Sequence, residues 1–250
     1  MAQEAILTEP FLSAETLEKV KRMTFQVVLI GTDGLILGSD RRSVYISNES
    51  NDDLGASAQP QDICKFELSS DGEIVCAFAG SPYSSSVAKA IAHSTEYSLA
   101  ASDAEREKEA KAKLRGLGGL PNGQKDEIII ARRGELGHID VLARRGSSEA
   151  TFTKVTSHIC LGNNLISARF ILRHFYKSRP IDDLVDIALL TLSCAAWEDP
   201  SNIGGGFDII LLNKKGFTKP KHYAMDDPKI LENRERFNRA VLGSIYPISS

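Results

Sequence analysis

Histidine and cysteine, the residue types that most often supply bases and metal ligands, are spread thinly through this chain. No two of the five histidines have metal-ligand spacing, and the sequence has no Gly-x-Ser-x-Gly elbow. The four cysteines stand singly in apolar stretches and form no Cys-x-x-Cys pair, so we expect buried free thiols. We therefore predict no metal site, no cofactor and no histidine base. The cysteines are Cys64, Cys76, Cys160 and Cys194.

Two short motifs match known ligand-binding or catalytic patterns, but each lacks the partners that its pattern needs. The run from Gly116 to Pro121 is the nearest match to a dinucleotide loop, yet proline replaces the third glycine and a charged stretch, not a strand, precedes it. Ser86 and Lys89 have Ser-x-x-Lys spacing, but the Ser-Asp-Asn and Lys-Thr-Gly motifs are missing. We interpret the first as a plain loop and the second as a chance match.

The composition is typical of a folded, soluble chain. Of 250 residues, 42% are hydrophobic and 25% charged, and 30 basic against 33 acidic residues give a formal net charge of −3. Every apolar run is far shorter than the ~20 residues that span a bilayer, and no basic cluster is interleaved with aromatic residues. The first residues lack a signal peptide's basic opening and apolar core. We therefore expect a cytoplasmic protein with no membrane and no nucleic-acid partner.

Strands occur in groups, and so do helices. Residues 24–30 and 35–38 are apolar runs joined by Asp33-Gly34, a pair typical of hairpin turns. Because hairpins and not helices join the opening strands, we expect a single α+β domain, with two sheets packed together and helices outside; a doubly wound fold is the alternative. In chain order, we expect a helix at 13–22, strands at 24–30 and 35–38, a loop at 48–60, strands at 63–68 and 73–79, a helical stretch at 84–115, strands at 127–132, 137–143 and 150–155, helices at 165–176 and 181–197, a strand at 208–212 and a helix at 226–242.

The first hairpin carries a resemblance to a known family. Residues 24–42, TFQVVLIGTDGLILGSDRR, resemble the first hairpin of the proteasome-type α/β subunits, which are N-terminal-nucleophile hydrolases. In that family an aspartate follows the catalytic threonine by sixteen residues, and a lysine lies on the next strand pair. Thr24, Asp40 and Lys65 match these positions, Lys65 being displaced by a longer loop.

The resemblance extends from about residue 13 to residue 216. It continues through residues 76–80 (CAFAG), 160–164 (CLGNN) and 203–210 (IGGGFDII). It implies a four-layer αββα sandwich, the N-terminal-nucleophile hydrolase fold, formed by residues 24–250 behind an N-terminal extension at 1–23. It also implies a homo-oligomeric ring or a ring of related subunits, a peptide or unfolded-protein substrate, and room for an ATPase partner.

The same resemblance assigns roles to individual residues. Cleavage between Met23 and Thr24 would free the α-amine of Thr24, which has an ordinary pKa of ~7.7–8.0. This amine would lie beside the Thr24 hydroxyl and would accept its proton. Lys65 would act electrostatically on the amine and the hydroxyl, and Asp40 would hold Lys65 charged and oriented. The Gly80 N–H would stabilise the oxyanion of the tetrahedral intermediate.

The substrate's side chain is expected beside these residues. Ser43 and Phe78, by their places next to Arg42 and Gly80, are our candidates for its pocket.

A second interpretation assigns the chain no catalysis. Non-catalytic subunits of the same family keep an N-terminal helix that ends in a basic pair before the first strand, as residues 18–22 (EKVKR) do here. Active subunits usually have glycine before the threonine, whereas this chain has Met23, and the family's Gly-Ser-Gly is Gly162-Asn163-Asn164. From the matches at Thr24, Asp40 and Lys65 we predict a threonine-type endopeptidase. The basic pair and the departures from active subunits leave a structural or gating subunit as the alternative.

Overall fold

The Asp33-Gly34 pair forms the expected hairpin turn in the computed structural model of the protein. Strand β1 (Phe25–Ile30) pairs antiparallel with β2 (Leu35–Asp40). Gly34 is needed here, because a Cβ at this position would lie 2.1 Å from the carbonyl oxygen of Leu212. The turn also fixes a helix, since Asp33 Oδ1 accepts the Ile181 N–H at 2.9 Å. The structure describes residues 24–46, 58–79, 82–100, 102–116, 126–133, 139–146, 152–162, 165–213 and 215–245.

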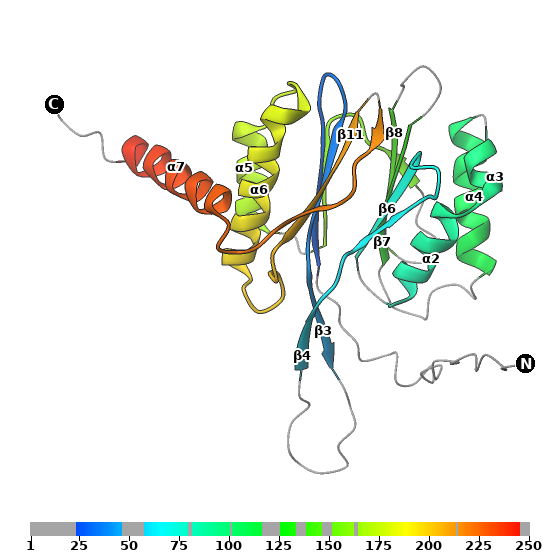
Figure 1. Ribbon diagram of the computed structural model, residues 1–250, viewed down its shortest axis with the longest axis horizontal. Coiled ribbons are helices and arrows are strands. Elements are labelled where there is room, and N and C mark those ends of the chain that lie inside the picture. Colours follow the sequence, from blue (N-terminus) through cyan, green and yellow to red (C-terminus); the bar gives the residue numbers. More distant parts are fainter. Residues whose placement is uncertain are drawn as a thin grey trace, which may run out of the picture.

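Two antiparallel sheets form the centre of the described structure (Figure 1). The first sheet has the strand order β10-β1-β2-β11-β12, with β13 also paired to β11, and the second has the order β5-β6-β7-β8-β9. The remaining strands of the first sheet are β10 (His158–Gly162), β11 (Phe207–Asn213), β12 (Gly216–Phe217) and β13 (Lys221–Tyr223). Those of the second are β5 (Phe66–Leu68), β6 (Ile74–Ala79), β7 (Asp126–Arg133), β8 (Ile139–Gly146) and β9 (Phe152–Lys154).

Helices cover the outer sides of both sheets, as Figure 1 shows. Helix α6 (Ile181–Glu198) packs on the first sheet beside α5 (Ile166–Phe175), and most of its residues are buried, as its apolar sequence predicts. Helix α2 (Pro82–Ala92) packs on the second sheet, with α3 (Thr95–Leu99) and α4 (Asp103–Gly116) beyond it. The last helix, α7 (Pro228–Ile245), packs against α6.

The alternation of side chains along β1 separates two cores. Phe25, Val27 and Leu29 belong to the cluster between the first sheet and α6, whereas Val28 belongs to the cluster between the two sheets. Gln26 lies on the same face of β1 as Val28, and its amide reaches the second sheet. A third cluster fills the space between the second sheet and α2.

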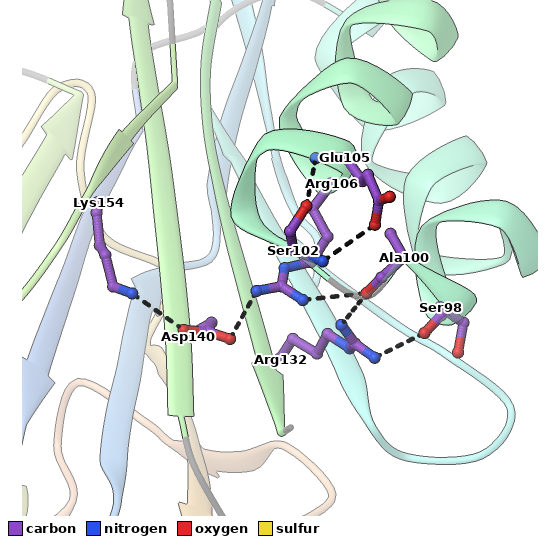
Figure 2. A network of polar contacts seen from close by, with 8 residues as sticks. All are labelled: Ser98, Ala100, Ser102, Glu105, Arg106, Arg132, Asp140 and Lys154. Carbon is purple, nitrogen blue, oxygen red and sulfur yellow. Dashed lines mark hydrogen bonds and ion pairs between the residues drawn. The ribbon is translucent and has the colours of Figure 1, made fainter. Parts of the chain in front are cut away.

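A polar network ties the second sheet to the helices outside it (Figure 2). Arg106 of α4 pairs with Asp140 of β8 at 2.9 Å, and Lys154 of β9 reaches the other oxygen of that carboxylate at 3.3 Å. Arg132 of β7 donates to the carbonyl oxygen of Ser98, which lies in α3, and to that of Ala100, which directly follows α3. These bonds satisfy carbonyl groups that the short helix α3 leaves unpaired at its end.

The expectation of a four-layer αββα sandwich was wrong, although the α+β class holds. The described residues form antiparallel sheets with six helices, and they are not confined to four layers. Strands β3 (Arg42–Ile46) and β4 (Ala58–Asp62) pair only with each other and form a ribbon that projects from the two sheets (Figure 1). Helix α7 lies outside α6 and packs against it (Figure 1).

Several expected elements differ in extent from those observed. The helical stretch expected at 84–115 is three helices, because the chain turns at Ser94, which caps α3 by accepting the Tyr97 N–H, and again before α4. The loop expected at 48–60 ends earlier, since β4 begins at Ala58. Strand β10 was not expected, and the helix expected at 13–22 lies outside the described residues.

The cysteines are free but not all buried. Cys76 and Cys194 are buried as expected, whereas Cys160 is partly exposed and Cys64 is exposed, so the expectation was wrong for these two. Burial raises the pKa of Cys194 to about 11. No helix within the described ranges is both long enough and apolar enough to cross a bilayer.

Candidate active site

Asp40 and Lys65 form an ion pair that is almost completely shielded from solvent. Lys65 Nζ lies 2.8 Å from Asp40 Oδ1, and the two side chains are 2% and 0% exposed. Asp40 ends β2, and Lys65 directly precedes β5, so the pair links the first sheet to the second. Lys65 Nζ also donates to the carbonyl oxygen of Arg42 at 2.6 Å. Two residues 25 positions apart are thus brought together, as their expected roles require.

The same carboxylate holds the backbone next to Thr24. Asp40 Oδ1 accepts the Phe25 N–H at 2.9 Å, and this nitrogen belongs to the peptide bond that follows Thr24. The Lys65 ammonium and the Thr24–Phe25 peptide therefore share one oxygen atom and lie within two hydrogen-bond lengths of each other. Thr24 itself is only 4% exposed.

The glycine run at 204–206 supports the carboxylate from the other side. The Gly204 N–H donates to Asp40 Oδ2 at 3.4 Å, while the Gly204 carbonyl accepts the N–H groups of Arg41 and Arg42 at 3.0 and 2.8 Å. This loop therefore closes around the end of β2. The glycines were noticed in the sequence, but their backbone contacts with Asp40 could not be found there, because they depend on the pairing of β2 with β11.

Burial and hydrogen bonding act on Asp40 in opposite directions. Removal from water is the largest influence and raises the pKa of this carboxyl above its ordinary value. The Lys65 ammonium and the N–H groups of Phe25 and Gly204 oppose that shift, because each stabilises the ionised form.

Gly162 lies directly behind Thr24. It pairs with Phe25 across β10 and β1, and its φ of 95° falls in the left-handed region that favours glycine. A Cβ at this position would lie 1.7 Å from the Thr24 carbonyl oxygen, so only glycine leaves room for the Thr24 backbone. Its N–H donates to the carboxylate of Glu127 on β7.

The other predicted site residues have different outcomes. Ser43 is 1% exposed at the start of the ribbon, and its hydroxyl has no hydrogen-bond partner in the structure as described. The Phe78 side chain packs in the cluster between the second sheet and α2, while its backbone faces the first sheet. Their roles in a substrate pocket stay predictions. Gly80 and Met23 lie outside the described residues.

A second polar cluster, missed from the sequence, lies next to the candidate site. Arg41 Nη1 pairs with the buried Asp208 at 2.6 Å, and His222 Nδ1 lies 3.1 Å from the other oxygen of Asp208. Arg41 follows Asp40 directly, so this pair anchors the chain next to the candidate site. Among the described side chains, no three histidine, cysteine, aspartate or glutamate residues gather as a metal site would require.

Comparisons by sequence give no assignment. No known protein family matches this chain, and no curated protein does so either.

Comparison of the fold finds clear similarity to solved structures of Anbu proteins. Anbu (ancestral beta-subunit) from Yersinia bercovieri is 15% identical, with a TM-score of 0.70 and coverage of 91% of this chain and 98% of that one. Anbu from Hyphomicrobium sp. strain MC1 is 16% identical, with a TM-score of 0.65 and coverage of 91% and 99%. The helical assembly of the Anbu complex from Pseudomonas aeruginosa gives 16% identity, a TM-score of 0.64 and coverage of 91% and 98%.

These similarities correct the family expected from the sequence. The matched structures are proteasome-like Anbu proteins, distinct from the proteasome-type α/β subunits that the motifs resemble, so that family assignment was wrong. The matches at Thr24, Asp40 and Lys65 were misleading, because three residues are too few to decide the family of a chain of 250 residues. At 15–16% identity the comparison establishes a shared fold.

Proposed function

We propose that this chain is a threonine-type endopeptidase whose nucleophile is Thr24, freed by cleavage after Met23. The observation that carries the proposal is the buried Asp40 carboxylate, which binds both Lys65 and the peptide N–H that follows Thr24. A buried ion pair costs desolvation energy and is weak evidence for stability, so its place beside the peptide bond that follows Thr24 favours a chemical role.

The proposed reaction needs no histidine and no metal ion. The freed α-amine takes the proton of the Thr24 hydroxyl as Oγ1 attacks the carbonyl carbon of a peptide bond. The amine then returns this proton to the leaving nitrogen, and an ester links Thr24 to the acyl half of the substrate. Water hydrolyses the ester and restores Thr24. Lys65 disfavours the protonated amine and stabilises the developing alkoxide, because it places a positive charge close to both.

Asp40 and Gly80 would support this chemistry in different ways. Asp40 keeps Lys65 charged and fixed, and its bonds to Phe25 and Gly204 hold the carboxylate in one orientation. Gly80 would supply the oxyanion donor, and loss of such a donor typically lowers kcat by about 100- to 1,000-fold.

Substrate and assembly belong to the same proposal. We propose peptides or unfolded proteins as substrates, with the hydroxyl of Ser43 lining the side-chain pocket. The helical assembly named for the Anbu complex of P. aeruginosa supports an oligomer of this chain, in which a ring and an ATPase partner remain proposals.

Intact-mass measurement of the purified oligomer tests the central step. We expect the loss of residues 1–23 and hydrolysis of fluorogenic peptides, and we expect Thr24→Ala to abolish both. Thr32→Ala is the matched control, because Thr32 is an exposed threonine in the β1–β2 turn. A wild-type chain that stays full-length in the assembled particle and hydrolyses no peptide would instead indicate a structural or gating subunit.

A further inference from the structure

Gln26 is a polar residue in an otherwise apolar layer. Its side chain is fully buried on the face of β1 that points to the second sheet, where the next residue on that face is Val28 of the inter-sheet cluster. An apolar side chain would be expected here, because burying an amide is unfavourable unless hydrogen bonds replace those to water.

Only one half of this amide is satisfied. Gln26 Nε2 donates to the carbonyl oxygen of Phe78 at 2.7 Å, while Oε1 has no partner in the described structure. An acceptor buried without a partner is costly, and such costs are concentrated at functional sites. The hydrogen bond of the donor half is therefore the contact that can account for an amide at this position.

The peptide units of Phe78 connect Gln26 to the candidate site. The Phe78 N–H donates to the carbonyl oxygen of Lys65 at 3.4 Å, and its own carbonyl oxygen accepts the Gln26 amide. Gly80 follows Phe78 by two residues in the chain. The Gln26 side chain, two residues after Thr24, thus contacts β6. This strand binds the backbone of Lys65 and is followed in the chain by Gly80, the proposed oxyanion donor.

A second link joins the sheets at the same end. Glu127 of β7 pairs with Ala79 of β6 and accepts the N–H of Gly162, the residue directly behind Thr24. The bonds made by Gln26 and Glu127 run from first sheet to second on neighbouring strands. Toward the other end, the same inter-sheet layer is filled by apolar side chains.

We propose that Gln26 is a positioning residue, whose amide sets the distance between the strand of Thr24 and β6, the strand that binds the backbone of Lys65 and directly precedes Gly80. This inference rests on the proposed peptidase function. Because a donor or a charge displaced by about 1 Å can lower a rate ~100-fold, a bond of fixed length across the sheets would act on kcat.

Two substitutions of Gln26 test this inference. Gln26→Met keeps the volume but removes the donor, and Gln26→Asn keeps the amide but shortens its reach by one methylene group. We expect each to lower kcat for peptide hydrolysis by about 10- to 100-fold, with KM within about twofold of wild type. The rate at which residues 1–23 are lost should fall in parallel.

Val28→Ala is the matched control, because it creates a cavity at the next position on the same face without touching a polar bond. It should lower the melting temperature and leave kcat of the folded protein within about twofold. The inference is overturned if both Gln26 variants keep wild-type kcat, or if they lose no more of it than Val28→Ala does. An inactive, full-length wild type would refute the peptidase function itself, a result distinct from either of these.

Discussion

Asp40 Oδ1 and Lys65 Nζ are 2.8 Å apart in a part of the protein that water does not reach. Two charges are brought out of water there, and each is held by further bonds: Asp40 by the N–H groups of Phe25 and Gly204, Lys65 by the carbonyl of Arg42. Such pairs add little net stability, but removal of one partner leaves an uncompensated charge inside the protein.

Lys65→Met should therefore destabilise the protein strongly, by about 3–5 kcal/mol. The double variant Asp40→Asn/Lys65→Met should be less destabilised than Lys65→Met alone, since the asparagine is neutral and its oxygen can still accept the Phe25 N–H. Unfolding of wild type, Asp40→Asn, Lys65→Met and the double variant in urea gives the four free energies that are needed. Free energies that simply add would contradict a direct pair, because residues in contact are expected to couple by about 0.5–3 kcal/mol.

The titration of Asp40 should limit the proposed activity at low pH. Burial raises the pKa of this carboxyl, and Asp40 must be ionised to hold Lys65 by charge. Activity should therefore fall as the pH drops through that raised pKa, at a higher pH than the ordinary aspartate value of about 3.9. A profile of kcat/KM against pH measures this limb. A limb at or below the ordinary value would contradict the prediction.

The same shift affects stability with the opposite sign. The folded protein keeps the Asp40 proton up to a higher pH than the unfolded chain does. The contribution of Asp40 to the free energy of unfolding is therefore complete below the pKa of the unfolded chain and is lost as the pH rises through the folded pKa. Subtracting the pH dependence of Asp40→Asn from that of wild type isolates this contribution, which should not grow with rising pH.

Local patterns in the sequence predicted the strands β1, β2 and β6 around the site, but not β10, which places Gly162 against Thr24. Asp33-Gly34 determined the first hairpin, and the two-residue alternation of β1 is present in the structure. The ribbon of β3 and β4 was not predicted, because pairing between Arg42 and Asp62 depends on residues 20 positions apart. Helix α7 was predicted from its amphipathic pattern, but the pattern does not say whether such a helix covers a sheet or another helix.

The sequence pointed to the contact between Asp40 and Lys65, but not to the backbone contacts around it. The family resemblance assigned Lys65 the role of a cation and Asp40 that of the acid that orients it, and the structure brings these two side chains together. The contacts of Gly204 with Asp40 and of Gln26 with Phe78 join segments more than 50 residues apart, and no periodicity or motif encodes them. Such contacts follow from the packing of two sheets.

Gly162→Ala should disturb the site by displacing the backbone of Thr24. The new Cβ would have to displace the Thr24 carbonyl oxygen. The alanine would also have to adopt a φ of 95°, which L-residues rarely take. We expect a loss of stability of at least about 1–3 kcal/mol and a fall in the proposed cleavage after Met23. Unfolding in urea and intact-mass measurement check the two effects.

The control for this prediction is Gly72→Ala. Gly72 also has a positive φ, of 72°, but a Cβ there would meet no atom within 4 Å. This variant should lose the strain energy alone and keep its processing. Equal processing defects in both variants would show that backbone strain, and not contact with Thr24, is responsible.

Asp140→Asn should separate stability from activity. Asp140 pairs with Arg106 inside the network of Figure 2, and it lies opposite Arg132 on β7, at the far end of that strand from Glu127 and the candidate site. Loss of its charge leaves Arg106 buried without its carboxylate partner, which should cost about 3–5 kcal/mol. Because a strand rises by ~3.3 Å per residue, the five residue steps from Glu127 to Arg132 place this loss about 16 Å from the Glu127 end of β7. Peptidase activity per folded molecule should stay at the wild-type level, and a folded variant that lost it would show that this network also positions the site.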